Sequence, residues 1–107
     1  MNTDRFKYRV WDKYCKEYLP EGVLLDGRTG MVAGTKYDGY VIEQCTGLHD
    51  KNGKLIYEND VDSVGMAVRY RDGAFEIYKD DFHVRLDSKN AAVIEITGNI
   101  HEMEVEG

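Results

Sequence analysis

The 107-residue sequence contains only two cysteines and one proline, and it has neither a block of basic residues nor a long apolar run. Cys15 and Cys45 form no Cys-x-x-Cys pair, which excludes a small scaffold stapled by disulfides, and we expect both thiols to be reduced. No apolar run approaches the roughly 20 residues that span a bilayer, and the polar start lacks the apolar core of a signal peptide. The sequence thus predicts a cytoplasmic protein without a membrane partner.

Acidic side chains outnumber basic ones. Lys and Arg number 14 against 20 Asp and Glu, which gives a formal net charge of −6. Proteins that follow a phosphate backbone need clustered cations to replace its counterions. Because the sequence has no such cluster, nucleic acid is a disfavoured partner.

The length of the chain bounds its organisation and its stability. Domains usually contain about 100 to 150 residues, so 107 residues predict a single domain, residues 1–107. A chain of this size buries only about 60 to 68% of its unfolded surface. So small a buried surface provides little stability, and contacts with other copies would add to it. We therefore expect a homo-oligomer.

Composition and patterning predict strands. Eleven glycines can supply turns, and eight tyrosines suit a pleated surface. Residues 5–11 alternate, with Phe6, Tyr8 and Val10 on one face and Trp11 on the other, as in a half-buried strand. Further strands are expected at residues 17–19, 40–45, 82–86 and 92–96, with Ile100 continuing the last one, and a hairpin with a longer loop is expected at residues 23–33.

A hairpin over residues 66–78 is the clearest local prediction. Asp72-Gly73 is a signal for a two-residue turn, and such a turn fixes the register of the strands beside it. One face of the hairpin then carries an aromatic pair and a β-branched pair, and the other carries a charge pair. The predicted opposite residues are Arg71 and Ala74, Tyr70 and Phe75, Arg69 and Glu76, Val68 and Ile77, and Ala67 and Tyr78.

The remaining turn signals complete the predicted fold. Asn52-Gly53 indicates a tight turn, and Gly98 indicates a bulge or bend. We predict an all-β fold with little or no helix, a small closed or partly open barrel of about seven or eight short, hairpin-rich strands, because closure removes exposed sheet edges. Within the single domain, residues 1–46 form an N-terminal β region and residues 47–107 a small barrel region.

Three separated segments share the pattern of one protein family. The segment from Phe6 to Lys13 has Trp-Asp before a polar turn, and the segment from Gln44 to Val61 contains Thr-Gly-Leu, Asp-Lys-Asn-Gly and Ile-Tyr-Glu-x-Asp. The segment from Thr97 to Glu102 contains Gly-Asn-Ile. In order and spacing these motifs resemble the YopX family of phage and prophage proteins, whose members usually have Gly where this chain has Asn59. The resemblance implies a β-rich, oligomeric, phage-derived protein of a bacterial host cell, without an assigned molecular role.

Acidic residues around one predicted turn are weak candidates for a metal site. Asp50, Glu58 and Asp60, with His49 beside them, could hold a divalent ion, although their spacing fits no established loop. Asp50 before Asn52-Gly53 is better explained as a turn former that bonds its own backbone, and Asp60 as a second one. We expect no cofactor.

The other candidate groups also favour structural roles. The three histidines show no metal-ligand spacing and are expected at the surface, and Cys45 is expected to be a small core residue rather than a nucleophile. The aromatics could stack on single-stranded nucleic acid, but the missing cations favour packing. We therefore predict that Phe6, Tyr8 and Trp11 contribute to a subunit interface.

No catalytic motif is present, and three functional hypotheses follow. The first is a non-enzymatic phage accessory protein that self-assembles and binds a phage or host protein. The second is a metal-dependent hydrolase that acts on a nucleotide or nucleic acid through Asp50, Glu58 and Asp60. The third is a small barrel that binds nucleic acid, suggested by the strand number and the aromatics.

Overall fold

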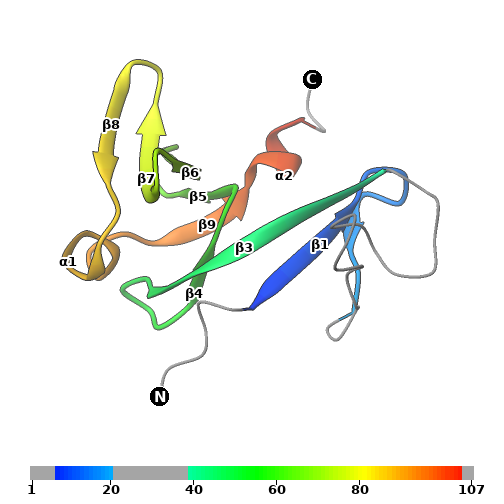
Figure 1. The fold of residues 1–107 in the computed structure, drawn as a ribbon, viewed down its shortest axis with the longest axis horizontal. Coiled ribbons are helices and arrows are strands. Elements are labelled where there is room, and N and C mark those ends of the chain that lie inside the picture. The colour runs from blue at the N-terminus through cyan, green and yellow to red at the C-terminus, as the bar shows by residue number, and fades with distance from the viewer. Residues whose placement is uncertain (1–6, 21–38, 105–107) are drawn as a thin grey trace. The chain divides into compact units, whose positions relative to one another are not determined.

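The computed structural model describes residues 7–20 and 39–104, and most of its elements are strands (Figure 1). The chain divides into two compact units, one formed by Met1–Lys7 and Gln44–Gly107 and the other by Tyr8–Glu43. The long strand Tyr40–His49 (β3) passes from one unit into the other. The single domain remains a prediction.

The smaller unit contains a tight β-hairpin. Tyr8–Asp12 (β1) and Glu17–Tyr18 (β2) pair antiparallel, and the turn between them is organised by Asp12. The Asp12 carboxylate accepts a hydrogen bond from the backbone N–H of Tyr14 at 2.9 Å, and Lys16 takes a left-handed φ of 55°. The strand predicted at residues 17–19 is therefore confirmed, because this turn returns the chain beside β1.

The predicted alternation along the first strand is wrong at its end. Tyr8 is 37% exposed, whereas Val10 and Trp11 on successive positions are both buried. Trp11 lies opposite Tyr18 in the hairpin, and the two rings meet edge-on with centroids 4.9 Å apart. Both faces of the strand end are thus covered. Phe6 lies outside the described residues, and so does the hairpin predicted at residues 23–33.

The larger unit contains the end of β3 and most of the other strands. β3 pairs with Leu55–Tyr57 (β4), in a sheet of order β2-β1-β3-β4. A second sheet of order β8-β7-β6-β5-β9 curls into a half-barrel. Its strands are Asp60–Asp62 (β5), Ala67–Arg71 (β6), Ala74–Lys79 (β7), Phe82–Arg85 (β8) and Ile96–Asn99 (β9). The predicted all-β class is confirmed.

The hairpin of β6 and β7 has the predicted register. Arg71 pairs with Ala74, Tyr70 with Phe75, Arg69 with Glu76, Val68 with Ile77, and Ala67 with Tyr78. Asp72 and Gly73 both have positive φ, 53° and 84°, as a two-residue hairpin turn of the favoured hand requires. The rings of Tyr70 and Phe75 meet edge-on at 5.1 Å.

The core lies in the larger unit. Alternate residues of a strand point to the same side of the sheet, so each strand can send an apolar side chain into one shared core. Its members are Ile56, Val68, Ile77, Leu86, Ala91 and Ile96, with Leu48, Met66, Phe75, Val84 and Ile94 packed against them. No helix among the described residues has the length and apolar character needed to cross a membrane.

Two short helices replace structure that was predicted as turn and strand. Ser88–Ala91 (α1) is capped by Asp87, whose carboxylate accepts the N–H groups of Lys89 and Asn90. Because α1 ends with its C-cap at Ala92, the last strand, β9, does not start until Ile96. The strand predicted at residues 92–96 is therefore wrong. The register of β9 with β5 shifts beside Gly98, which confirms the bulge that was predicted there.

The predicted continuation of the last strand through Ile100 is also wrong. Ile100–Glu104 is a short helix, α2, and Asn99 caps it by accepting the N–H groups of His101 at 2.9 Å and Glu102 at 3.2 Å. The Asn99 amide also donates to the Glu102 carboxylate at 3.3 Å. Asn followed three residues later by Glu is a capping-box signal.

Substitution of Gly53 tests how the β3–β4 loop is formed. Gly53 has a φ of +82°, and a Cβ built there meets no atom within 4 Å. We expect Gly53→Ala to lower the free energy of unfolding by about 1 kcal/mol through backbone strain alone, and Gly53→Asn to cost less, because Asn tolerates this conformation. Urea unfolding measures both. Equal losses for Ala and Asn would contradict this explanation.

Candidate functional site

The Asp50 carboxylate accepts three backbone hydrogen bonds. It is 5% exposed, and its Oδ1 accepts hydrogen bonds from the N–H groups of Asn52 and Lys54, both at 2.9 Å. Its Oδ2 accepts the N–H of Ile96, also at 2.9 Å, from a residue 46 positions away. The carboxylate therefore both shapes the β3–β4 loop and attaches the start of β9 to it.

The environment of Asp50 lowers the pKa of its carboxyl group. Burial opposes ionisation, but the N–H groups of Ile96, Lys54 and Asn52 all donate to the charged form, and the Lys54 ammonium adds to them. The net effect is a pKa below the ordinary value for Asp. The group is therefore a stable structural anion, unsuited to exchange a proton near neutral pH.

Asp62 repeats the arrangement of Asp50 in the loop between β5 and β6. Its Oδ1 accepts the N–H groups of Val64 at 3.1 Å and Met66 at 2.8 Å, and Gly65 has a φ of +87°. Both loops also bond the same distant segment: Lys51 N–H donates to the Ile94 carbonyl at 2.9 Å, and Ser63 N–H to the Glu95 carbonyl at 3.0 Å. The two turns thus hold residues 94–96 from both sides.

The other two metal candidates also bond backbone groups. Glu58 accepts the N–H of Gln44 at 2.7 Å, and Asp60, which is 2% exposed, accepts the N–H of Tyr57 at 2.8 Å. Asn59, between them, has a left-handed φ of 70°. Among the described residues, no three Asp, Glu, His or Cys side chains are grouped as metal ligands would be.

The histidines and cysteines are dispersed. His49 and His83 are exposed, but His101 is 5% exposed, so the predicted surface position is wrong for this residue because α2 turns it inward. Cys45 is fully buried, as predicted for a core residue. Cys15 is exposed, and its hydrogen bond with Asp12, together with the charge of that carboxylate, raises the pKa of the thiol. A raised pKa disfavours the nucleophilic thiolate.

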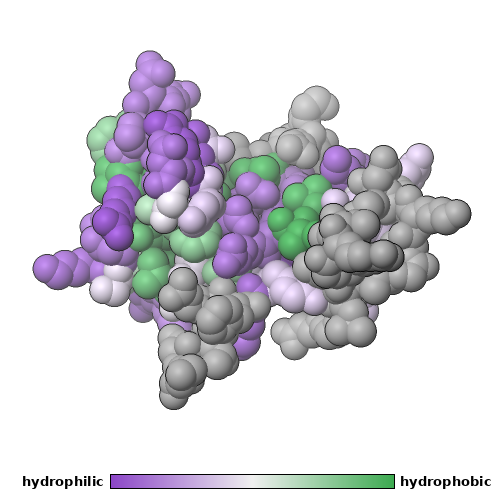
Figure 2. Space-filling view, viewed as in Figure 1, coloured by the Kyte–Doolittle hydropathy of each residue, from purple (hydrophilic) through white to green (hydrophobic). Residues whose placement is uncertain are grey.

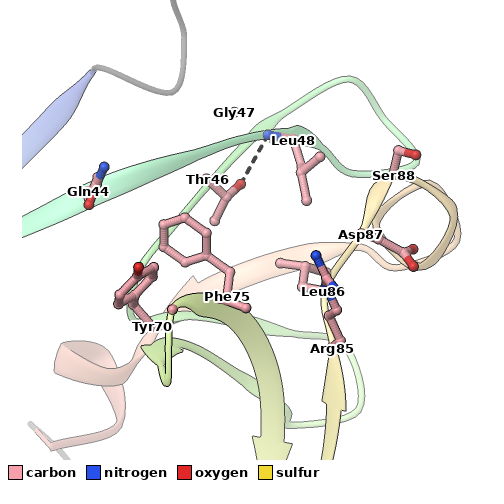
Figure 3. A pocket seen from close by; sticks show the side chains of 12 residues that line it. Gln44, Thr46, Gly47, Leu48, Tyr70, Phe75, Arg85, Leu86, Asp87 and Ser88 are labelled. Atoms are coloured by element: carbon pink, nitrogen blue, oxygen red, sulfur yellow. Dashed lines mark hydrogen bonds between the residues drawn. The ribbon is translucent and has the colours of Figure 1, made fainter.

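The larger unit carries an open cleft of about 610 Å³ (Figure 3). Apolar side chains of Leu48, Phe75 and Leu86 line it, and Tyr70, which is 53% exposed, stands at its side with its ring against Phe75. The cleft is open to solvent. Its other lining residues are Gln44, Thr46, Gly47, Gly73, Ala74, Arg85, Asp87 and Ser88.

Some polar groups of the cleft are used by the fold and others are available. The Thr46 hydroxyl donates to the Ile56 carbonyl at 2.8 Å and accepts the N–H of Leu48 at 3.0 Å (Figure 3). Asp87 caps α1. Four other side chains form no hydrogen bond or ion pair with any described residue, and they are Gln44, Tyr70, Arg85 and Ser88.

This arrangement suits binding better than chemistry. The ionisable groups at the cleft are Tyr70, Arg85 and Asp87, and they include no thiol, imidazole or pair of carboxylates for nucleophilic or acid–base catalysis. An apolar floor with amide, hydroxyl and guanidinium groups around it resembles the core and rim of a protein interface. Sequence patterns did not indicate this cleft, because its residues come from separate strands.

Comparisons with known proteins agree with this fold. The family model described as "YopX protein" matches residues 7–104. A solved structure, the crystal structure of protein EF1440 from Enterococcus faecalis, is similar to the chain with a TM-score of 0.71 and 26% sequence identity, over 92% of this chain and 94% of that chain. No curated protein matches the chain.

Replacing Asp50 tests its role through the pH dependence of stability. In Asp50→Asn the amide oxygen can still accept two bonds, but its NH₂ faces the Ile96 N–H, so we expect a loss of about 2 to 3 kcal/mol at pH 7. Because the folded pKa is lowered, the carboxylate stabilises the wild type above the unfolded pKa of about 3.9, and this contribution is lost as pH falls through the folded value. The free energy of unfolding of Asp50→Asn should therefore fall less between pH 7 and low pH than that of the wild type.

Urea unfolding between pH 7 and pH 2.5 measures both effects. Asp87→Asn is the matched control, because Asn caps a helix about as well as Asp and should change stability by less than about 0.5 kcal/mol. An acid-induced loss in Asp50→Asn as large as in the wild type would show that other groups are responsible.

Proposed function

Because the chain belongs to the YopX family, a name that specifies no reaction, we propose that it is a non-enzymatic module that binds a partner protein and assembles with copies of itself. One observation carries the proposal: the cleft offers unused polar groups around an apolar floor but no reacting pair. Tyr and Arg, which are enriched at the energetic centres of interfaces, are represented by Tyr70 and Arg85.

The openness of the cleft favours a segment of protein as its occupant. Sites for small molecules usually enclose about 70 to 90% of the ligand surface, and this cleft leaves much of an occupant in solvent. A protein segment can insert one apolar side chain beside Leu48 and Phe75 while its backbone bonds Gln44 and Arg85. The remainder of the partner then covers the rim.

Family membership supports the setting of this function. We place the module among phage or prophage accessory proteins in the cytoplasm of a bacterial cell, with a phage or host protein as its partner. The similar solved structure is of a protein from Enterococcus faecalis, which supports a bacterial origin. Exposed large apolar or aromatic side chains outside the cleft support contacts with other copies, and they include Tyr8, Tyr14, Val64 and Phe82.

The predicted N-terminal interface has less accessible aromatic surface than the sequence suggested. Trp11 is 9% exposed and packs on Tyr18 of its own chain, so most of its surface is already used. Of the two members of the predicted set that the structure describes, Tyr8, at 37% exposed, is the more accessible. Between Tyr8 and Trp11, a role in assembly therefore depends mainly on Tyr8.

Photocrosslinking from the cleft tests partner binding. A photoreactive phenylalanine analogue in place of Tyr70 should capture one defined bacterial or phage protein in cells, whereas the same analogue at Val93, which is 75% exposed, should not. With the purified partner, Tyr70→Ala should weaken binding at least about tenfold, because tenfold corresponds to about 1.4 kcal/mol and truncation of a tyrosine at an energetic centre of an interface costs about 2 kcal/mol or more. Val93→Ala is the matched control. Equal capture at both positions, or no change with Tyr70→Ala, would contradict the proposed cleft.

Calorimetry separates this function from the metal-dependent hydrolase. We expect no saturable heat with magnesium, manganese or calcium at millimolar concentration, because Asp50, Glu58 and Asp60 already accept backbone hydrogen bonds. Glu58→Gln and Asp60→Asn serve as controls. A saturable heat in the wild type that these substitutions abolish would support the hydrolase instead.

A further inference from the structure

Strand β8 is the outermost strand of the five-stranded sheet, and no described strand pairs with its outer side (Figure 1). It follows a two-residue turn at Asp80-Asp81, where Lys79 pairs with Phe82. Hydrogen-bonded and non-bonded pairs alternate along an antiparallel ladder, starting from the bonded pair at such a turn. The Leu86 N–H bonds the Phe75 carbonyl at 3.0 Å, as this alternation requires. The backbone groups of His83 and Arg85 therefore point away from β7.

The side chains along this edge are also unusual for an exposed strand. Phe82 is 61% exposed, and Val84 beside it packs against the core. Arg85 forms no ion pair with any described residue, although Glu76 lies opposite it in the sheet. Figure 2 shows apolar surface beside the largely hydrophilic atoms of this part of the molecule. Natural edge strands are usually protected by short length, charged residues, Pro or a covering segment, and β8 has four residues with one Arg but no Lys or Pro.

We propose that β8 pairs antiparallel with β8 of a second copy, centred on His83, so that the two half-barrel sheets become continuous. In this register Asp81 of each copy lies opposite Arg85 of the other, and Phe82 lies opposite Val84. The sequence from residue 81 to residue 85 is therefore complementary to itself in both charge and apolar character. The backbone groups of His83 and the Arg85 N–H obtain partners in this pairing, and the Arg85 carbonyl, which already accepts the Asn90 side-chain amide at 2.7 Å, has a second lone pair for the new strand.

Other registers are less favourable. Centring the pair on Val84 places His83 against Arg85 and Asp81 against Asp87, and centring it on Arg85 places this residue against itself. Like charges directly opposite destabilise a sheet. Moving the centre toward the turn leaves fewer paired residues, because the chain folds back at Asp80. Complementarity thus selects one register.

The opposed His83 side chains are compatible with this pairing. Each imidazole lies 3.0 Å from Glu76 of its own chain. The same carboxylate contacts Arg69 at 3.1 Å and Arg71 at 3.4 Å, so the outer face of β6 to β8 has more positive than negative groups. Asp81 of a second copy would add negative charge beside this face, next to Arg85.

The inference specifies the self-assembly part of the proposed function and rests on it. The paired segment is short, so the contact is smaller than the roughly 1,200 Å² of a stable interface, and we expect a dimer that dissociates on dilution. Because the dimer is symmetric, it contains two Asp–Arg pairs and two Phe–Val pairs, and one substitution therefore changes two cross-strand pairs at once.

Charge reversal at two positions tests the register. Asp81→Arg and Arg85→Asp each place like charges opposite one another, and each should weaken the dimer about tenfold or more in light scattering over a concentration series. An equimolar mixture of the two variants should dimerise about as well as the wild type, because every Arg then faces an Asp. Lys89→Asp, the same reversal on exposed α1, should leave dimerisation unchanged. Asp81 does not line the cleft, so its effect is separate from partner binding.

Hydrogen exchange of the wild type provides a test that needs no variant. Dilution should accelerate exchange of the His83 and Arg85 amides but not of the Leu86 amide, whose bond lies within the chain. An oligomer that withstands both reversals, or a mixture that stays monomeric, would overturn the β8 pairing and leave assembly through another surface. A wild type that is monomeric up to about millimolar concentration would overturn self-assembly itself, whereas crosslinking from Tyr70 would still test the cleft.

Discussion

The larger unit depends on one buried carboxylate, that of Asp50. A carboxylate has two oxygens that each accept more than one hydrogen bond, and Asp50 uses one for its own loop and the other for Ile96. The interaction is strong because a charged acceptor is removed from water only where donors replace it. Without it, the N–H of Ile96 would be left without an acceptor where β9 joins the sheet. One side chain thus both shapes its own loop and bonds a strand that is distant in the sequence.

Local signals in the sequence predicted local structure well. Asp72-Gly73 specified the turn, and the pattern of residues around it specified the register, because all the necessary contacts lie within a few positions. Asn59 was expected to tolerate a left-handed conformation, and it has one. The turn at Asn52-Gly53 was placed correctly but is a three-residue loop with only Gly53 at positive φ, since Asp50 bonds the N–H groups of both Asn52 and Lys54.

Where the prediction was wrong, a competing signal or a distant contact decided the structure. The β-branched run at residues 92–96 suggested a strand, but Asp87 caps a helical turn just before it, and the loops of Asp50 and Asp62 take its carbonyl groups. Asn99 with Glu102 was a capping box that strand periodicity concealed. The cleft joins Gln44 and Arg85, which are distant in sequence, so no motif could have indicated it.

The repeated loop of Asp50 and Asp62 also has a consequence for the order of folding. Each loop closes within five residues and needs nothing else from the chain, so both can form as soon as their own hairpins exist. Their distant acceptors at Ile94 and Glu95 come much later in the sequence. During synthesis both loops therefore emerge before residues 94–96, and each can already have its shape when that segment forms its hydrogen bonds to them. A segment that is made later thus joins two loops that were made earlier.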